Sequence, residues 1–325
     1  MARPAVVRQI VCHDWRAVSD ADMNRLYAVE QRRWEHQLDW DLGSAWTELE
    51  RGRQLGTVSG LVAIDRDGRI GGWTYYLVHE GALQIGGLVA ESEAVTSALL
   101  ADVLADPDTH IAERVTVFAF TDAPGLVGEL RARGLAVDRY WYLRRNGLDV
   151  EPMGTGIRIW SPDDMNPAAA LLGRAFEPSD ASRPFAPDGT PEQWRHYVRQ
   201  LVEGNGCGQF LPSASFVAGD GPGRLAAAAL VTRIGPTTAH LAQLAVAPHS
   251  RRRGLGASLV NAAFAGAARL GCTRMTLLVG GRNQAARALY ESIRFEPVAT
   301  FVAAGGAYPR RSTSVAPGAV IMTRR

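Results

Sequence analysis

Short apolar runs that predict strands alternate along this chain with longer runs whose apolar residues recur every three or four positions, as in helices. In the first half, two strand-like runs flank the polar segment 65–68 and predict a hairpin. The predicted elements there are helix 20–34, strands 58–64, 70–78 and 83–90, helix 95–104, strand 115–120, helix 126–133 and strand 137–144. Mixed strands and helices indicate an α/β or α+β fold.

The same order of patterns starts again after residues 146–156, a segment rich in glycine and proline. The second half predicts strand 157–160, helices within 162–176 and 191–202, strands 215–218, 225–233 and 239–246, helix 259–267, strand 275–279, helix 285–292 and strands 295–302 and 318–323. A repeated unit of about 150 residues accounts for this recurrence. We therefore expect two domains, 1–148 and 157–325, joined by a linker at 149–156.

One stretch of the second half combines a strand, a basic turn and the start of a helix. Pro248 ends the apolar run 239–246 because it has no amide to donate, and a helical apolar face follows from Leu259. The turn between them reads Arg251, Arg252, Arg253, Gly254, Leu255, Gly256. A helix start attracts anions, glycine permits close backbone approach, and arginine adds positive charge. The stretch predicts a diphosphate site, although an ordinary turn with solvated arginines has the same composition.

This stretch resembles the pyrophosphate loop of the Gcn5-related N-acetyltransferases, the GNAT family. The residues that match the family's loop and the strand end before it are Arg251, Gly254, Gly256, Leu244, Val246 and Pro248. A second family motif is matched downstream by Asn283, Ala286, Tyr290 and Phe295. Arg294 stands where the family usually has a glycine. The resemblance covers residues 157–302.

The resemblance implies transfer of an acetyl group from acetyl-CoA, the co-substrate, to a primary amine of a small molecule by direct attack. Each of two tandem GNAT domains is then a mixed, mostly antiparallel central sheet flanked by helices. The implied cofactor-binding residues are Leu244, Ala245, Val246, Arg251, Arg252, Arg253, Gly254, Leu255, Gly256, Ala257, Asn283 and Ala286. Of Leu244 and Val246, only backbone groups are expected to act. Asn283 also fits a helix N-cap.

Two residues are candidates for proton transfer. The resemblance assigns Tyr290 as the acid that protonates the leaving thiolate, and a packing tyrosine is the alternative. His240 falls where histone-type members of the family carry a general-base glutamate, and a histidine with an ordinary pKa near 6.5 can accept a proton. A half-buried structural histidine is equally compatible with its strand position. The alternative bases are the carboxylates of the predicted loop 176–190, namely Glu177, Asp180 and Asp188.

The acceptor is expected to enter between that loop and the segment 303–317. Tyr308, Arg310 and Arg311 in this segment fit a carboxylate or phosphate on the acceptor, or an ordinary solvated loop. The first copy lacks the basic turn, because residues 91–94 place Glu91 and Glu93 where the arginines would lie, and carboxylates repel a diphosphate. Leu130 aligns with Tyr290. We therefore expect a degenerate first copy with a structural role, or one with an altered ligand pocket.

The charge and residue composition of the chain indicate which kinds of partner and cofactor are to be expected. The net charge is +2, with 35 basic residues that are all arginine, so no general attraction to nucleic acid or membrane is expected. The three cysteines are scattered, no Cys/His cluster has metal spacing, and no apolar run has transmembrane length. We expect a cytoplasmic enzyme without a metal, as a monomer or weak homodimer, in specialised metabolism. The alternatives are a peptide or protein N-acetyltransferase and a non-catalytic acyl-CoA-binding protein.

Overall fold

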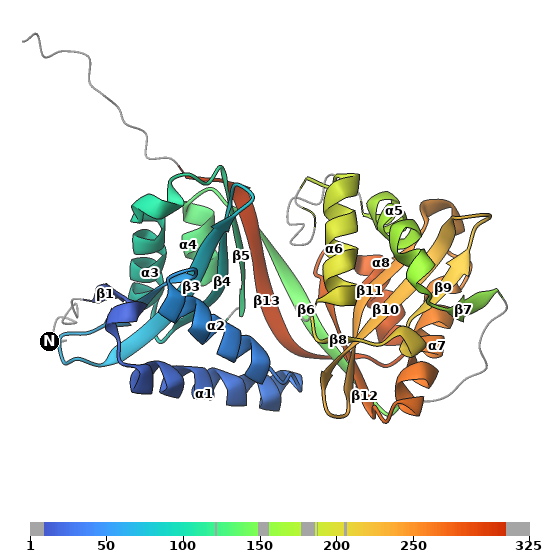
Figure 1. Ribbon diagram of the computed structural model, residues 1–325, viewed down its shortest axis with the longest axis horizontal. Helices are drawn as coiled ribbons and strands as arrows, with labels where there is room; N and C mark the ends of the chain where they lie inside the picture. Colours follow the sequence, from blue (N-terminus) through green and yellow to red (C-terminus); the bar gives the residue numbers. More distant parts are fainter. Residues whose placement is uncertain are drawn as a thin grey trace, which may run out of the picture.

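The computed structural model describes residues 10–120, 122–148, 156–176, 186, 188–204 and 207–309, and every structural statement below concerns these residues. Two lobes carry helices on both faces of a sheet, and long strands run from one lobe to the other (Figure 1). The strands of both lobes belong to a single sheet of 13 strands.

The first copy begins with a short strand and two helices, and it ends with a strand that leaves its lobe. Its elements are β1 (Val11–Asp14), α1 (Asp20–Leu38), α2 (Gly43–Leu55), β2 (Ser59–Ile64), β3 (Ile70–His79), β4 (Ala82–Ala90), α3 (Glu93–Ala105), β5 (Arg114–Phe120), α4 (Leu126–Ala132) and β6 (Ala136–Asn146). The predicted hairpin is confirmed as β2–β3, with Gly68 at φ +79° in its turn. Helix α2 has no counterpart among the predicted elements, because its few apolar residues are spread among polar ones.

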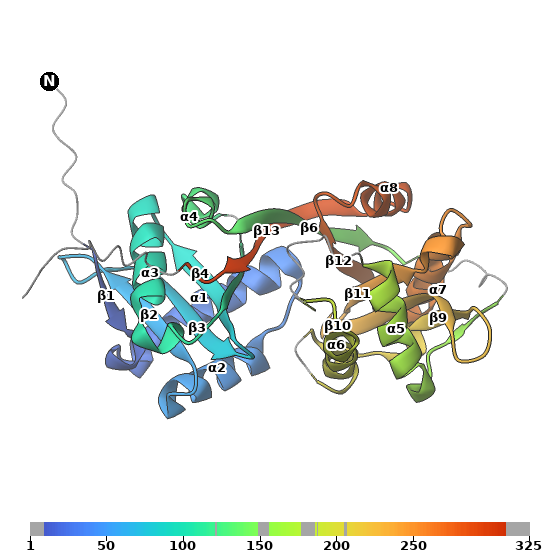
Figure 2. The same ribbon diagram turned by 90° about the horizontal axis from the view of Figure 1, so that it is seen from above.

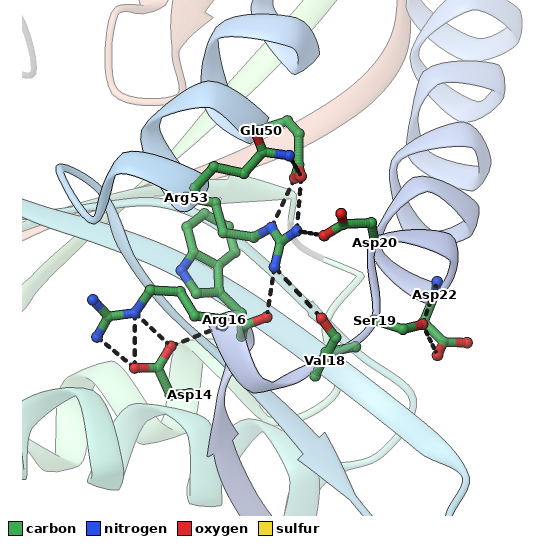
Figure 3. Close-up of polar contacts among 10 residues, drawn as sticks. Asp14, Arg16, Val18, Ser19, Asp20, Asp22, Glu50 and Arg53 are labelled. Carbon is green, nitrogen blue, oxygen red and sulfur yellow. Dashed lines mark hydrogen bonds and ion pairs between the residues drawn. The ribbon is translucent and has the colours of Figure 1, made fainter.

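The guanidinium of Arg53 joins α2 to the start of α1. Its side chain is only 3% exposed. It donates hydrogen bonds to the backbone oxygens of Trp15 (3.1 Å) and Val18 (3.5 Å), and it forms ion pairs with Glu50 and Asp20 (Figure 3). A buried charge is tolerated when it is paired in this way, so the network fixes both helices of the first lobe at one junction.

The second copy repeats the order of the first. Its elements are β7 (Ile157–Ile159), α5 (Met165–Ala175), α6 (Pro191–Glu203), β8 (Gln209–Phe210), β9 (Phe216–Gly219), β10 (Leu225–Gly235), β11 (Thr238–Val246), α7 (Leu255–Arg269), β12 (Arg274–Gly280), α8 (Gln284–Ser292) and β13 (Glu296–Ala307). Each copy has one parallel pair, β4–β5 or β11–β12, in an otherwise antiparallel sheet. Helices α7 and α8 share one apolar cluster with the sheet, and α5 and α6 share another.

The centre of the sheet is built by an exchange of strands between the two copies. The order there is β4–β5–β13–β6–β12–β11, so β13 of the second copy pairs with β5 of the first, and β6 pairs with β12. Figure 2 shows both strands crossing between the lobes. Each copy's last described strand therefore completes the lobe of the other copy. Strands of the predicted domain 1–148 thus pair with strands of the predicted domain 157–325. The two ranges describe the repeat along the chain, and their use as domain limits stays a proposal.

Apolar side chains fill the seam where the strands cross. Leu38, Phe120, Tyr142 and Phe301 form one buried cluster there, contributed by α1, β5, β6 and β13. The Tyr142 hydroxyl donates a hydrogen bond to the Leu38 carbonyl at 2.8 Å. Burying each such side chain contributes roughly 1.5–3 kcal/mol, so the seam is a core in its own right.

The C-terminal part of the described chain differs from the prediction. Strand β13 continues to Ala307, so the predicted end of this strand at residue 302, and with it a loop beginning at 303, is wrong over residues 303–307. The cause is pairing with β5, a strand far away in sequence, which a local pattern cannot report. The predicted strand 318–323 lies outside the described residues. Among the described helices, none is long and apolar enough to cross a bilayer.

Candidate active site

Strands β11 and β12 run side by side only at their beginnings. Their parallel pairs are Thr238–Arg274, Ala239–Met275 and His240–Thr276. Beyond His240, β11 continues to Val246 against β10, with Ala242 bulged out between the paired residues Leu241 and Gln243. Within the described chain, the β12 side of this part of β11 has no strand partner. The two strands form a fork whose free backbone groups are available to a ligand.

Side chains on the free arm of the fork belong to the core. Leu244 and Val246 pack in the cluster that contains α7 and α8, whereas Ala245 belongs to the cluster of α5 and α6. A Cβ on Gly256 would lie 3.2 Å from Cδ2 of Leu289 in α8, so the absence of a side chain lets the start of α7 approach α8 closely. The side chains of Leu244 and Val246 are half-buried against this cluster, and the ligand role expected for their backbone groups stays a prediction.

Arg251 holds the turn that follows β11. Its Nε donates to the Val246 carbonyl at 3.2 Å, and its Nη2 donates to the Ala175 carbonyl at the end of α5 at 2.8 Å. The side chain is therefore an anchor between β11 and α5. Arg252 and Arg253 are exposed, and no ion pair engages either of them within the described residues. Their charge is the part of the predicted basic turn that remains available to an anion.

The start of α7 lacks the side chains that usually satisfy a helix end. Gly254 is the N-cap with φ +78°, provides no side-chain acceptor, and is followed by a first turn without an acidic residue. The amides of Leu255, Gly256 and Ala257 precede the first helical hydrogen bond, which Ser258 donates to Gly254. Unsatisfied amides, the helix dipole and nearby arginines fit the diphosphate of a coenzyme.

Helix α8 brings the second predicted motif to the same place. Asn283 is its N-cap and accepts a hydrogen bond from the Ala286 amide at 3.1 Å. Tyr290 is 6% exposed, and its ring packs edge-on against Phe295 with 5.7 Å between centroids. Burial raises the pKa of Tyr290 above its usual value, so the phenol stays protonated at neutral pH. Tyr290, Ala286 and the fork residues share one apolar cluster.

Comparison with known proteins agrees with this geometry. Residues 177–295 match the acetyltransferase (GNAT) family. The mycothiol acetyltransferase of Beutenbergia cavernae is 31% identical over 216 residues, which are 60% of this chain and 68% of that protein. The chain belongs to the GNAT acetyltransferase family. It is therefore an acyltransferase, as the motifs in the second copy predict.

Solved GNAT structures have the same fold. A GNAT protein from Sphaerobacter thermophilus aligns with a TM-score of 0.64 and 17% identity, covering 93% of this chain and 96% of that one. A tandem GNAT protein from the clavulanic acid biosynthesis pathway aligns with a TM-score of 0.52 and 16% identity, covering 77% and 83%. The likeness concerns the fold, and it confirms the predicted mixed sheet of tandem GNAT domains.

His240, the predicted base of the GNAT site, points to the opposite face of the sheet from Tyr290. Its neighbours Ala239 and Leu241 both pack in the cluster with α7 and α8, and successive side chains of a strand alternate between faces. Another residue on the His240 face, Gln243, donates a hydrogen bond to a tyrosine of α6. The structure thus brings Tyr290 and the basic turn together on one face and leaves His240 on the other.

The His240 ring is buried among aromatic side chains. Its ring is 2% exposed and contacts Trp40 (centroids 5.2 Å apart) and Tyr142 (6.0 Å). Nδ1 lies 2.9 Å from Oγ1 of Thr276. Burial lowers the pKa of His240 to about 3, so the ring is neutral at pH 7 but accepts a proton far less readily than an ordinary histidine. The base role stays a prediction, and the burial favours the structural alternative.

Two of the other candidates for base and acceptor contacts, Asp188 and Tyr308, have structural partners in the first lobe. Asp188 forms an ion pair with Arg114 of the first copy (2.5 Å), and the hydrogen bond from that arginine holds the pKa of Asp188 below its usual value. Tyr308 is buried in the first lobe, where its hydroxyl donates to the Leu104 carbonyl at 2.9 Å, so the expected acceptor contact is replaced by a structural one. The remaining candidates, all outside the described residues, are Glu177, Asp180, Arg310 and Arg311.

Some residues at the site have no signal in the sequence. Trp40 lies between α1 and α2 of the first copy, yet it covers His240 of the second. Asp39 beside it accepts a hydrogen bond from Arg144 at 3.0 Å and pairs with Arg274, which ties this segment to the second lobe. Contacts between segments so far apart follow from the strand exchange. Among the described residues, no group of three or more His, Cys, Asp and Glu side chains could hold a metal.

The first lobe has the same fork with different chemistry around it. β4 and β5 pair in parallel from Ala82–Arg114 to Ile85–Val117, after which β4 continues alone against β3. A bulge lies at Gly86, between Ile85 and Gly87, as it does at Ala242 in β11. The ring of Tyr75 covers this bulge, since a Cβ on Gly86 would lie 2.2 Å from Tyr75 Cε2. The backbone of the GNAT fork is retained in both lobes.

Proposed function

We propose that the second lobe is an acetyl-CoA-dependent N-acetyltransferase that acts on a primary amine of a small molecule. One observation carries this proposal above the others. The uncapped start of α7, with Gly254 and two exposed arginines, adjoins the free arm of β11, and the protonated phenol of Tyr290 belongs to the same cluster. Acetyl-CoA supplies an activated acetyl group, and these residues match what a coenzyme thioester needs from a protein.

Each group has a distinct role in this proposal. The amides at the start of α7 hold the diphosphate, assisted by Arg252 and Arg253. The free backbone of Leu244 and Val246 binds the pantetheine arm and orients the thioester carbonyl. The amine attacks that carbonyl directly, the carbon–sulfur bond breaks, and Tyr290 donates its proton to the departing sulfur. Asn283 acts on the same site through the helix it caps.

Removal of the proton from the amine is the less constrained step. His240 is assigned to it by sequence position, and its ring in the described conformation is covered by Trp40. For His240 to act, Trp40 has to move aside or water has to carry the proton. A neutral amine, deprotonated in solution, needs no protein base at all, and a high pH optimum would then follow from the amine itself.

The acceptor class rests on the relative rather than on the pocket. The Beutenbergia cavernae protein is named a mycothiol acetyltransferase, and this name favours a small-molecule acceptor over a peptide. A role in specialised metabolism stays a proposal of the same kind. The chain spans about two thirds of that protein, and its exact acceptor does not carry over. A peptide acetyltransferase and a non-catalytic acyl-CoA-binding protein are the alternatives that the experiment has to separate.

We further propose that the first lobe does not bind acetyl-CoA. The residue that caps α3 is Ser92, whose Oγ accepts a hydrogen bond from the Val95 amide at 3.3 Å. Glu93 lies in the first turn, and Glu91 pairs with Arg69 at 2.7 Å. A helix end that is already satisfied and flanked by carboxylates repels a diphosphate. In this proposal the fork of the first lobe has a structural role and no coenzyme-binding role.

The decisive experiment measures coenzyme A release. The purified chain is incubated with acetyl-CoA and a panel of amino sugars, amino acids, polyamines and basic peptides, and each product is identified by its mass. N-acetylated forms of the same compounds serve as controls, because they lack the nucleophile. Product from small amines supports the proposal, and product from peptides alone replaces it with the peptide alternative. Binding of acetyl-CoA without any product leaves the non-catalytic alternative.

A further inference from the structure

Arg145 is a nearly buried arginine that the first copy places inside the second lobe. It lies on β6, where it pairs with Met275 of β12, and its side chain is 8% exposed. Nη1 donates a hydrogen bond to the carbonyl of Ile293 at 2.7 Å, and Nε donates to the carbonyl of Gly147 at 3.2 Å. Its Cζ lies 4.6 Å above the ring centre of Phe264 in α7.

These contacts converge on the helix that carries the proposed acid. Ile293 is the C-cap of α8, and Tyr290 lies in the last turn before it. A cation at a helix C-terminus stabilises the end of the helix through the dipole and through the free carbonyls. On the other side, Phe264 contacts Phe295 (5.9 Å between centroids), and Phe295 contacts Tyr290 (5.7 Å). Arg145 thus restrains the end of α8 by two routes.

The first lobe provides an internal comparison at the matching positions. Arg114 and Arg274 begin the parallel pairing in their lobes, so Val115 of β5 corresponds to Met275 of β12. The residue paired with Val115 is Gly306 of β13, which therefore corresponds to Arg145. The same alignment sets Leu130 and Leu135 of the first lobe against Tyr290 and Phe295 of the second. Where the tyrosine is absent, the aromatic partner and the arginine are absent too.

A purely architectural need would apply to both lobes, because both contain a short helix followed by an exchanged strand. In the first lobe, a Cβ on Gly306 would lie 3.1 Å from Leu135 Cδ2, so Leu135 packs against the strand backbone at the position where the second lobe carries the Arg145 side chain. The lobe is complete without the cation. The arginine is present in the lobe that has the tyrosine and absent from the other lobe, although both lobes have the same fold.

We propose that Arg145 is a positioning residue for Tyr290, supplied by the copy that does not carry the site. It holds the last turn of α8 so that the phenol stays aligned with the thioester sulfur. This inference rests on the proposed function, since it assumes that Tyr290 is the acid. The strand exchange then has a catalytic as well as a structural consequence, because the first copy contributes to the geometry of the reaction in the second.

The test compares Arg145→Met with Arg139→Met in the full chain. Methionine keeps an apolar chain over Phe264 and removes the donor and the charge, while Arg139 is an exposed arginine of the same strand. We expect Arg145→Met to lower kcat by about tenfold to a hundredfold, because small displacements of a reacting group have effects of this size. KM for acetyl-CoA should stay within about twofold, since the start of α7 is untouched, and Arg139→Met should match the wild type.

A double variant separates positioning from general loss of structure. Groups that act as one unit are not additive, so adding Arg145→Met to Tyr290→Phe should lower kcat no further. An equal fall in both backgrounds, or no fall in either, would overturn the proposal. Should Arg145→Met fail to fold, Arg145→Lys retains the charge at the helix end but loses the planar fork, and the same cycle is run with it.

Failure of the inference can be told from failure of the proposed function. If Tyr290→Phe lowers kcat but Arg145→Met and Arg145→Lys do not, Tyr290 remains the acid and the positioning role of Arg145 is refuted. If Tyr290→Phe leaves kcat unchanged, the assignment of the acid fails and the positioning role fails with it. Melting temperatures of all variants are measured in parallel, because a structural role alone predicts lower melting temperatures with kcat per folded molecule unaltered.

Discussion

The turn from β4 to α3 and the turn from β11 to α7 occupy the same place in the two lobes and treat an anion in opposite ways. Ser92 satisfies the start of α3 with its own hydroxyl, and Glu93 adds a carboxylate to the first turn. Gly254 leaves the start of α7 open beside exposed arginines. Both turns follow a fork in the same sheet. The backbone is thus alike in the two lobes, and the side chains at the helix start differ in charge and in capping.

The difference between the lobes extends beyond the turn. Gln84 pairs with Thr116 as His240 pairs with Thr276, but Gln84 is exposed and His240 is covered by Trp40. Only the second lobe, within the described residues, has a histidine at this position and an aromatic residue from the other lobe over it. The comparison teaches that the copies diverged in what surrounds the fork rather than in the fork itself.

The largest expected effect comes from removing from α8 the phenol that α4 lacks. In Tyr290→Phe the ring remains and the proton donor is lost, so kcat should fall by about 10²–10⁴-fold, the usual contribution of general acid catalysis. Acetyl-CoA affinity should be nearly unchanged, and steady-state kinetics with calorimetry measures both. Tyr308→Phe, which removes a buried phenol from the first lobe, is the matched control and should leave kcat alone. An unaltered kcat in Tyr290→Phe would mean that water or another group protonates the sulfur.

A somewhat smaller effect is expected from adding to the start of α7 a carboxylate, which the first turn of α3 has in Glu93. Gly254→Asp adds a carboxylate beside the free amides of this helix start, so acetyl-CoA affinity should fall on the order of a hundredfold through like-charge repulsion. A Cβ at this position meets no atom within 4 Å, and aspartate tolerates the positive φ. Gly254→Asn has the same shape without the charge and should bind far better. If calorimetry showed equal acetyl-CoA affinity for the two variants, the assignment of the diphosphate site to this helix start would be refuted.

The next effect concerns pH and stability. The pKa of His240 is lowered to about 3 in the folded protein and is near 6.5 when unfolded, so below pH 6.5 the unfolded chain binds a proton that the folded chain refuses. The free energy of unfolding should therefore fall by about 1.4 kcal/mol per pH unit as the pH drops from 6 toward 3, with no such contribution above 6.5. His240→Gln, which copies Gln84, should lack this slope in urea unfolding.

Both proteins share every other titrating group, so the difference between their pH curves isolates the histidine. Parallel curves would show that His240 is accessible to protons in the folded protein. That result would also revive its role as base, because an accessible ring can titrate in the working range. The pH dependence of kcat/KM, measured on the same variant, then shows whether an acidic limb disappears with the histidine.

The smallest expected effect lies just after α8. Arg294 has φ +62°, whereas Gly134 has φ +79° at the matching position of the first lobe. The left-handed region costs a residue with a side chain roughly 1–2 kcal/mol, partly offset by the greater entropy of unfolded glycine. Arg294→Gly should therefore raise the free energy of unfolding by up to about 1 kcal/mol, measured as a shift of the urea midpoint. Gly134→Arg should shift it the other way.

Local features were predictable from the sequence, and contacts between distant segments were not. The hairpin of β2 and β3 and the helix after the basic turn each depend on residues close in the chain, and the structure contains both. The cap made by Asn283 is equally local. By contrast, the apolar pattern of β6 is the same whether it pairs within its own lobe or beside β12. The Leu38–Tyr142 contact joins residues 104 positions apart, and no periodicity could indicate it.

The site shows the same division. Gly254 and Tyr290 lie in motifs whose spacing reflects one turn and one helix, so both could be named in advance. The burial of His240 depends on Trp40, and the anchoring of α8 depends on Arg145, and both come from the other copy. A sequence pattern can identify a residue type at a strand position. Whether the side chain at that position is exposed to solvent depends on segments that are distant in the sequence, and a local pattern does not report them.

The place of β13 between β5 and β6 also constrains how the protein is made. During synthesis, β5 and β6 leave the ribosome before β13, the strand that lies between them in the sheet. Of the described elements, β13 is translated last. At ordinary translation speeds the open edges wait roughly ten to thirty seconds for their partner. Unpaired strand edges recruit other chains during such a wait. We therefore expect the nascent chain to be most prone to aggregation after β6 has been made and before β13 has emerged.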